Sequence, residues 1–151
     1  MLLTGTFVRS IDEKMRLAIP KQLREALGDA AAGTLFVTPH TDGSLAIYTE
    51  DALSQVAAHL SAASPAGQDV RDFSRLFYAR AQPVEIDDQG RIRIPADLNA
   101  LAGLGREAVL LGVQDHMELW DKKHWEEYLA KRQARYDEIA EAAFMVGGQG
   151  I

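Results

Sequence analysis

Two arginines in this sequence each follow an aspartate at a spacing of four residues. Asp12 and Arg16 lie in "IDEKMRLAIP", and Asp87 and Arg91 lie in "IDDQGRIRIP". An aspartate at the start of a turn accepts hydrogen bonds from the backbone amides that follow it. An arginine on the returning strand can then pair with that aspartate across the hairpin. Two such turns on one scaffold would present two guanidinium groups, which suits a symmetric polyanion such as duplex DNA.

The two motifs differ at the residue before the arginine. Gly90 precedes Arg91 and can adopt a positive φ at no steric cost. Met15 takes the same place before Arg16, and a left-handed conformation costs a residue with a side chain roughly 1–2 kcal/mol. The sequence therefore predicts that the first turn is strained or has another shape, with Met15 at its tip.

The motifs belong to two longer segments that resemble each other at an offset of 75 positions. After a small shift, "TLFVTPHTDGSLAIYTEDAL" is similar to "AVLLGVQDHMELWDKKHWEEYL". Each half predicts a strand, a turn, a strand, a short helix, two further strands and a longer helix. The identical pairs between the motifs are Ile11/Ile86, Asp12/Asp87, Arg16/Arg91, Ile19/Ile94, Pro20/Pro95 and Leu23/Leu98.

Local patterns place these elements along the chain. Pro20 and Pro95 are expected at the first positions of short helices, where a missing N–H costs nothing. An apolar stripe in the final helix, with the aromatic residues of that region, predicts packing in the core or between subunits. The expected strands are 6–12, 16–20, 35–38, 45–48, 83–87 and 91–95, and the expected helices are 21–28, 50–63, 69–81, 96–105 and 121–144, with a linker at 64–68.

Half of the chain, about 75 residues with short strands, buries too little apolar surface to be stable alone. We therefore expect an α+β fold in which two β units, duplicated in tandem, interlock into one pseudo-two-fold β core flanked by helices. The expected divisions are a first repeat at 5–52, a helical connection and linker at 53–80, a second repeat at 81–124, and a C-terminal helix and tail at 125–151.

Charge and composition set limits on partners and compartment. The formal net charge is −6, yet residues 1–28 carry five basic groups against three acidic ones, and residues 80–106 carry four of each. The segments that bear the motifs are thus the least acidic parts of the chain. The chain has no cysteine, which excludes disulfides and thiolate metal sites. No secretory signal and no apolar run of membrane-spanning length is visible, so we expect a cytoplasmic protein without a membrane partner.

The sequence shows no recognisable motif of a catalytic site or of a metal-binding site. His40, His59, His116 and His124 form no closely spaced pair, and His40 and His124 are expected to be solvated surface residues. The serines lack a nucleophile-elbow context, and no Gly-rich loop carries the lysine of a phosphate-binding loop. We therefore expect no catalytic residues, no metal ligands and no cofactor.

The tandem motifs, with Gly5 and Phe7 near the start, resemble the MraZ family of bacterial transcriptional regulators, in the SpoVT/AbrB-like superfamily. The resemblance runs from about Gly5 to the final helix. It implies a nucleoid-associated protein that forms homo-oligomeric rings and binds direct repeats in double-stranded DNA, upstream of the division and cell-wall gene cluster. It also implies DNA contact by Arg16 and Arg91. The expected DNA-binding residues are Arg9, Lys14, Arg16, Gln89, Arg91 and Arg93, and the expected turn-stabilising residues are Asp12, Asp87 and Gly90.

A second interpretation stays open at this point. Met15 and the acidic balance are compatible with an oligomeric protein-interaction scaffold of the same fold that binds DNA weakly or without specificity. A more distant resemblance connects the chain to antitoxins built on a single β unit. Those proteins carry a separate toxin-binding tail, whereas this chain has a second copy of the β unit instead.

Overall fold

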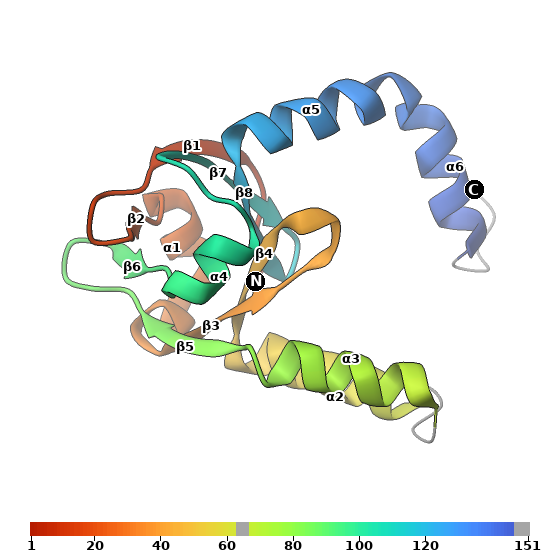
Figure 1. Cartoon of the computed structure of the whole chain (residues 1–151), viewed down its shortest axis with the longest axis horizontal. Helices are drawn as coiled ribbons and strands as arrows, with labels where there is room; N and C mark the ends of the chain where they lie inside the picture. The colour runs from red at the N-terminus through yellow and green to blue at the C-terminus, as the bar shows by residue number, and fades with distance from the viewer. Residues whose placement is uncertain (63–66, 147–151) are drawn as a thin grey trace.

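A computed structural model describes residues 1–62 and 67–146 (Figure 1). It has one larger and one smaller antiparallel sheet with helices packed around them, so the expected α+β class is confirmed. The strands are β1 (Thr6–Ser10), β2 (Arg16–Ala18), β3 (Thr34–Pro39), β4 (Leu45–Thr49), β5 (Gln82–Glu85), β6 (Arg91–Arg93), β7 (Glu107–Val113) and β8 (His116–Asp121). The α-helices are α1 (Lys21–Leu27), α2 (Glu50–Ala62), α3 (Gln68–Tyr78), α4 (Ala96–Leu101), α5 (Lys122–Arg132) and α6 (Tyr136–Val146).

The larger sheet has the strand order β1-β7-β8-β4-β3-β5. Its outer pairs join the two halves of the chain, because β1 pairs with β7 and β5 pairs with β3. The central pair, β4 with β8, also joins the two halves. Neither half could therefore form this sheet alone, since each edge strand pairs with a strand of the other half.

The smaller sheet consists of β2 and β6, the strands that follow the two motif turns. Leu17 pairs with Ile92 at its centre, and Arg16 pairs with Arg93. The backbone N–H of Ile94 donates to the carbonyl of Met15, and on the other side Ile19 donates to Gly90, both at 2.8 Å. This pattern is unchanged when each residue is exchanged for the one 75 positions away.

One apolar core lies between the two sheets. Leu17 and Ile92 point into it from the smaller sheet, and both are almost completely buried. Every second residue of the central strands of the larger sheet faces the same core, including Ile47 on β4 and Leu119 on β8. Helix α1 contributes Leu23 to this core, and α4 contributes the equivalent Leu98. Each short helix therefore covers one end of the core.

The opposite face of the larger sheet is covered by two helical groups. The pair α2 and α3 packs on Tyr48 of β4 through Leu53 and Phe77. Helix α5 packs on Trp120 of β8 through Trp125 and Tyr128. Figure 1 shows the two groups on opposite sides of the strands β4 and β8. The central strands are therefore covered on both faces, which explains why all five residues of β4 are buried.

Several expected details differ from the structure. Pro20 and Pro95 lie one position before α1 and α4, at the N-cap, because both keep the extended backbone of the preceding strand. The final helix is broken by a 3₁₀ turn at Gln133–Arg135. Part of the stripe predicted to pack in the core or between subunits packs in the core, because Trp125 and Tyr128 contact Trp120, whereas Tyr136 is 72% exposed. Helix α6 extends away from the larger sheet (Figure 1).

Two expected segments fall outside the structure in part or in full. The predicted tail at 147–151 lies outside the described residues, as does most of the predicted linker at 64–68, whose last residue begins α3. Within the described residues, no helix combines the length and the apolar character that crossing a bilayer requires.

Candidate nucleic-acid interface

The first motif turn is held by the carboxylate of Asp12. Its Oδ1 accepts hydrogen bonds from the backbone N–H groups of Lys14 and Arg16, each at 2.9 Å. Its Oδ2 accepts from Nε of Arg16 at 2.7 Å. One aspartate thus fixes both the backbone of the turn and the guanidinium that emerges from it.

The second motif turn has the same bonds. Oδ1 of Asp87 accepts from the backbone N–H groups of Gln89 at 2.9 Å and Arg91 at 3.0 Å. Its Oδ2 accepts from Nε of Arg91 at 3.3 Å, a longer contact than the one in the first turn. Arg91 is therefore held less tightly than Arg16.

Both aspartates have a pKa below the ordinary value of the group. The hydrogen bond from the backbone N–H of the motif arginine is the largest contribution and lowers the pKa of Asp12 and of Asp87, desolvation opposes it, and the guanidinium lowers the pKa as well. Both carboxylates therefore remain charged and keep the arginines oriented at neutral pH.

The two turns have the same shape despite their different residues. Gly90 has a φ of 79°, and Met15 has a φ of 63°. The backbone N–H of each donates to the carbonyl of its motif aspartate. Of the two outcomes expected for Met15, the structure thus shows the strained one, and the side chain is half-buried in a pocket with Asn99 and Leu104.

We expect Met15→Gly to stabilise the protein by about 1 kcal/mol, because glycine adopts this conformation without steric strain. The matched change Gly90→Ala should destabilise it by about 1–2 kcal/mol for the same reason. Its Cβ would also lie 3.1 Å from Cζ of Arg24. Urea unfolding followed by circular dichroism measures both, and a loss of stability in Met15→Gly would show that packing of the methionine outweighs the strain.

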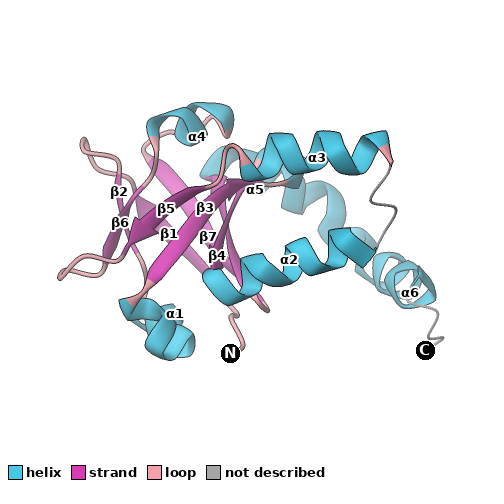
Figure 2. Ribbon diagram, turned by 90° about the horizontal axis from the view of Figure 1, so that it is seen from below, coloured by secondary structure: helices cyan, strands magenta, loops and turns pink. Residues whose placement is uncertain are grey.

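Three arginines share the outer face of the smaller sheet. Leu17 and Ile92 point into the core, so Arg16, Arg91 and Arg93 all point outward. Arg16 lies directly opposite Arg93 in the register of the ribbon. Figure 2 shows that the two motif turns lie at the same end of the molecule, away from α6. This end therefore carries a two-stranded ribbon with three arginines, of which Arg16 and Arg91 are paired with the turn aspartates.

The terminal nitrogens of the motif arginines remain available. Each of Arg16 and Arg91 binds its aspartate through Nε, and no other partner of either guanidinium occurs within the described residues. A guanidinium held at Nε keeps its two-nitrogen edge directed outward. That edge can donate two hydrogen bonds at once to a phosphate or to the O6 and N7 atoms of guanine.

Arg24 is a residue of this region that the sequence did not identify. Nε of Arg24 donates to the carbonyl of Ile19 at 3.0 Å, and its guanidinium lies against Gly90. The sequence offered no signal, because Arg24 is in α1 and the turn it covers is 66 positions away. The counterpart of Arg24 in the second half is Asn99, so the second turn has a neighbouring cation where the first turn has an amide.

The remaining predicted DNA-binding residues lie at different places. Lys14 and Gln89 are exposed at the tips of the two turns. Arg9 is on β1 in the larger sheet, where its Nη1 donates to the carbonyl of Val8 at 2.8 Å and its Cζ lies 5.8 Å from the ring centroid of Phe7. The structure thus brings Lys14, Gln89 and the three ribbon arginines together and leaves Arg9 folded back on its own strand.

The expectation that His40 and His124 are solvated surface residues is wrong. The side chain of His40 is 20% exposed and its Nε2 lies 3.1 Å from Oε2 of Glu118. The ring of His124 is half-buried, 5.0 Å from that of Trp120. Both rings are covered because the fold brings residues of β8 next to them, Glu118 to His40 and Trp120 to His124.

Comparison with known proteins gives one consistent result. Residues 77–146, which include the second motif, match the family model described as "MraZ protein, putative antitoxin-like". The chain is similar over most of its length to proteins named "Transcriptional regulator MraZ". That of Acetivibrio thermocellus is 37% identical over 143 residues, which cover 95% of this chain and 97% of the relative. Those of Desulforamulus reducens and Thermomicrobium roseum are 36% and 40% identical and cover 91% and 80% of this chain and 94% and 82% of their own lengths.

Proposed function

The chain belongs to the MraZ family, and on that basis we propose that it is a DNA-binding regulator of transcription that recognises specific sequences. Its relatives are named for transcriptional regulation and not for a catalysed reaction. The observation that carries the proposal is the outward face of the smaller sheet, with Arg16, Arg91 and Arg93 on one two-stranded ribbon.

A two-stranded β-ribbon has the right width to enter the major groove of B-form DNA. Arg91 and Arg16 would donate through their free terminal nitrogens to guanine edges or to phosphates. Arg93 and Lys14 would neutralise phosphates and so fix the position of the ribbon in the groove. Asp12 and Asp87 would not touch DNA, because their oxygens already accept the bonds of the turns.

We further infer that the two halves of the chain are tandem copies of one β unit related by a pseudo-two-fold axis. The matching motif sequences support this inference, and so do the pairing register and the strand order, which are unchanged when the halves are exchanged. The axis would pass between Leu17 and Ile92, through the centre of the ribbon. Such an axis can coincide with the local two-fold symmetry of the DNA backbone.

The protein would act as a homo-oligomer, which we propose is a ring. One ribbon buries little surface on DNA and should bind weakly alone, whereas several ribbons on successive repeats gain avidity of about 10²–10⁴. Apolar side chains exposed on α3 and on α6 support contacts between subunits, since exposed apolar patches often mark interaction surfaces. They are Phe73, Leu76, Tyr136, Ile139, Phe144 and Met145.

The resemblance to the family supplies the targets of this proposal. They are direct repeats upstream of the division and cell-wall gene cluster, and binding there would place the protein at the nucleoid. The chain would contact these repeats through the two motif turns of each subunit, with one subunit per repeat.

The proposed function is tested by fluorescence-anisotropy titrations of the wild-type protein in a series of salt concentrations. The DNA is the region upstream of the division-gene cluster of the source organism, and a scrambled duplex of the same composition is the control. We expect tighter binding to the native sequence and a steep loss of affinity with salt, since each phosphate contact releases counterions.

The outcome also decides between the two interpretations of the family fold. Equal affinity for native and scrambled DNA at low salt would reject sequence-specific regulation. The exposed apolar surfaces of α3 and α6 would then be explained by the scaffold function instead.

A further inference from the structure

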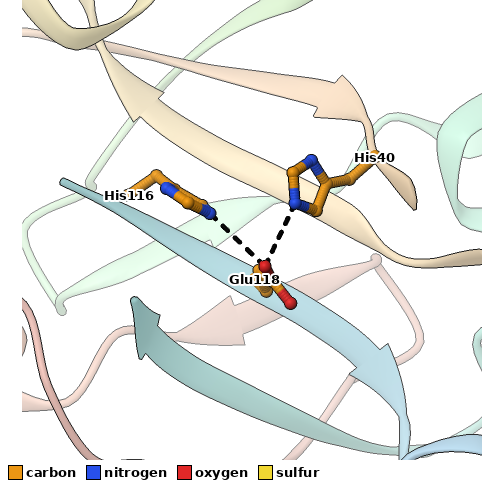
Figure 3. Close-up of side chains that lie close together, drawn as sticks. All are labelled: His40, His116 and Glu118. Carbon is orange, nitrogen blue, oxygen red and sulfur yellow. Dashed lines mark hydrogen bonds and ion pairs between the residues drawn. The ribbon is translucent and has the colours of Figure 1, made fainter. Parts of the chain in front are cut away.

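Two histidines and a glutamate meet on the outer face of the larger sheet, away from the arginine ribbon. His116 and Glu118 alternate on β8, and His40 follows β3, with β4 lying between them in the sheet. Their side chains are 13%, 16% and 20% exposed for His116, Glu118 and His40. Figure 3 shows both imidazoles directed at the same carboxylate.

The donor atoms have the spacing of a tetrahedral ion site. Oε2 of Glu118 lies 3.1 Å from Nε2 of His40 and 3.4 Å from Nε2 of His116. Ligands about 2.0–2.1 Å from a tetrahedral zinc ion are about 3.3 Å from one another. The three ligand atoms, one from each residue, all lie within 4.8 Å of one another.

His116 has a carboxylate beside each ring nitrogen. Its Nδ1 lies 2.8 Å from Oδ1 of Asp115, and its Nε2 lies 3.4 Å from Oε2 of Glu118. In the tautomer that has its N–H on Nδ1 and donates to Asp115, the lone pair of Nε2 faces the other two members of the cluster, as a metal ligand requires.

Outer partners hold these groups in place. Asp115 orients the ring of His116, and Nε1–H of Trp120 donates to Oε1 of Glu118 at 3.0 Å, which leaves Oε2 directed at the imidazoles.

We propose that His40, His116 and Glu118 form a binding site for a divalent transition-metal ion of the zinc type, with a water as fourth ligand. The site would tie the end of β3 to β8 across β4. Nitrogen and carboxylate donors in this number suit Zn²⁺ and Co²⁺ and disfavour Mg²⁺ and Ca²⁺, which prefer all-oxygen sites.

The test is isothermal titration of the chelator-treated full-length protein with ZnCl₂ at pH 7.5, in the absence of DNA. We expect one ion per chain and an affinity that falls at least about 100-fold in His40→Gln and in Glu118→Gln. Asp115→Asn keeps all three ligands and changes a half-exposed side chain, so it should fold normally and bind about 10–100-fold more weakly. His59→Gln, which removes an exposed imidazole on α2, is the matched control.

Co²⁺ gives a second measurement, because a four-coordinate site produces intense visible bands that six-coordinate surface binding lacks. These bands should appear in the wild type and in His59→Gln and disappear in His40→Gln. Absence of zinc binding by the wild type, or equal affinity in wild type, His40→Gln and Asp115→Asn, would overturn the site. Because no DNA is present, this result does not depend on the outcome for the proposed function.

Discussion

Arg91→Ala is expected to abolish most of the preference of the protein for its native DNA site. A guanidinium that donates two hydrogen bonds to a guanine discriminates against other bases by about 1–3 kcal/mol, a factor of roughly 5–150 in affinity. Every subunit of an oligomer carries the same substitution, so the effect on a multi-repeat site is larger. The slope of log affinity against log salt should also fall by about one for each phosphate that Arg91 would neutralise.

Arg16→Ala should have the smaller effect of the two. Nε of Arg16 is 2.7 Å from its aspartate, whereas the same contact of Arg91 is 3.3 Å, so Arg91 can adjust more freely to a base edge. The second turn has the additional charge of Arg24 beside it.

Arg91→Lys tests whether the shape of the guanidinium or only its charge is needed, and Lys123→Ala is its control. Arg91→Lys keeps the charge but lacks the two-nitrogen edge, so it should retain nonspecific binding and lose discrimination between native and scrambled DNA. Lys123→Ala removes an exposed charge on α5, away from the ribbon, and should bind like the wild type. Native affinity in Arg91→Ala, with the fold checked by circular dichroism, would mean that the second motif is only a structural turn.

If the proposed oligomer forms through α3 and α6, Leu76→Glu and Phe144→Glu are expected to dissociate it into smaller species. Leu76 is 66% exposed on α3 and Phe144 is 54% exposed on α6, so neither change should unfold the subunit. A charge buried at a subunit contact without a partner costs several kcal/mol, which is more than such contacts usually tolerate. Light scattering coupled to size-exclusion chromatography measures the mass of each variant.

Loss of the oligomer should weaken DNA binding in a specific manner. Affinity for DNA with several repeats should fall about 10²–10⁴-fold, while affinity for a single repeat stays unchanged, because only avidity is removed. Leu101→Glu changes an exposed leucine on α4 and serves as the control. An unchanged mass in both variants would exclude α3 and α6 as the contact, and the β core would then be the surface to test.

The motif turns and the short helices of this protein can be predicted from the sequence alone. Each motif turn depends on hydrogen bonds between residues no more than four positions apart, such as those of Asp87 to Gln89 and Arg91. The short helices follow directly from the apolar spacing after Pro20 and Pro95. Interactions of this range are encoded in neighbouring residues, so pattern and spacing are sufficient to predict them.

Which distant segments contact each other is known only from the tertiary structure. Arg16 lies opposite Arg93 because β2 pairs with β6, and Arg24 covers a turn from the other half of the chain. His40 and Glu118 are 78 positions apart in the sequence. They meet because β3 and β8 both pair with β4, one on each side of it. These features depend on strand register and on the surface available for packing, which no local pattern in a single sequence encodes.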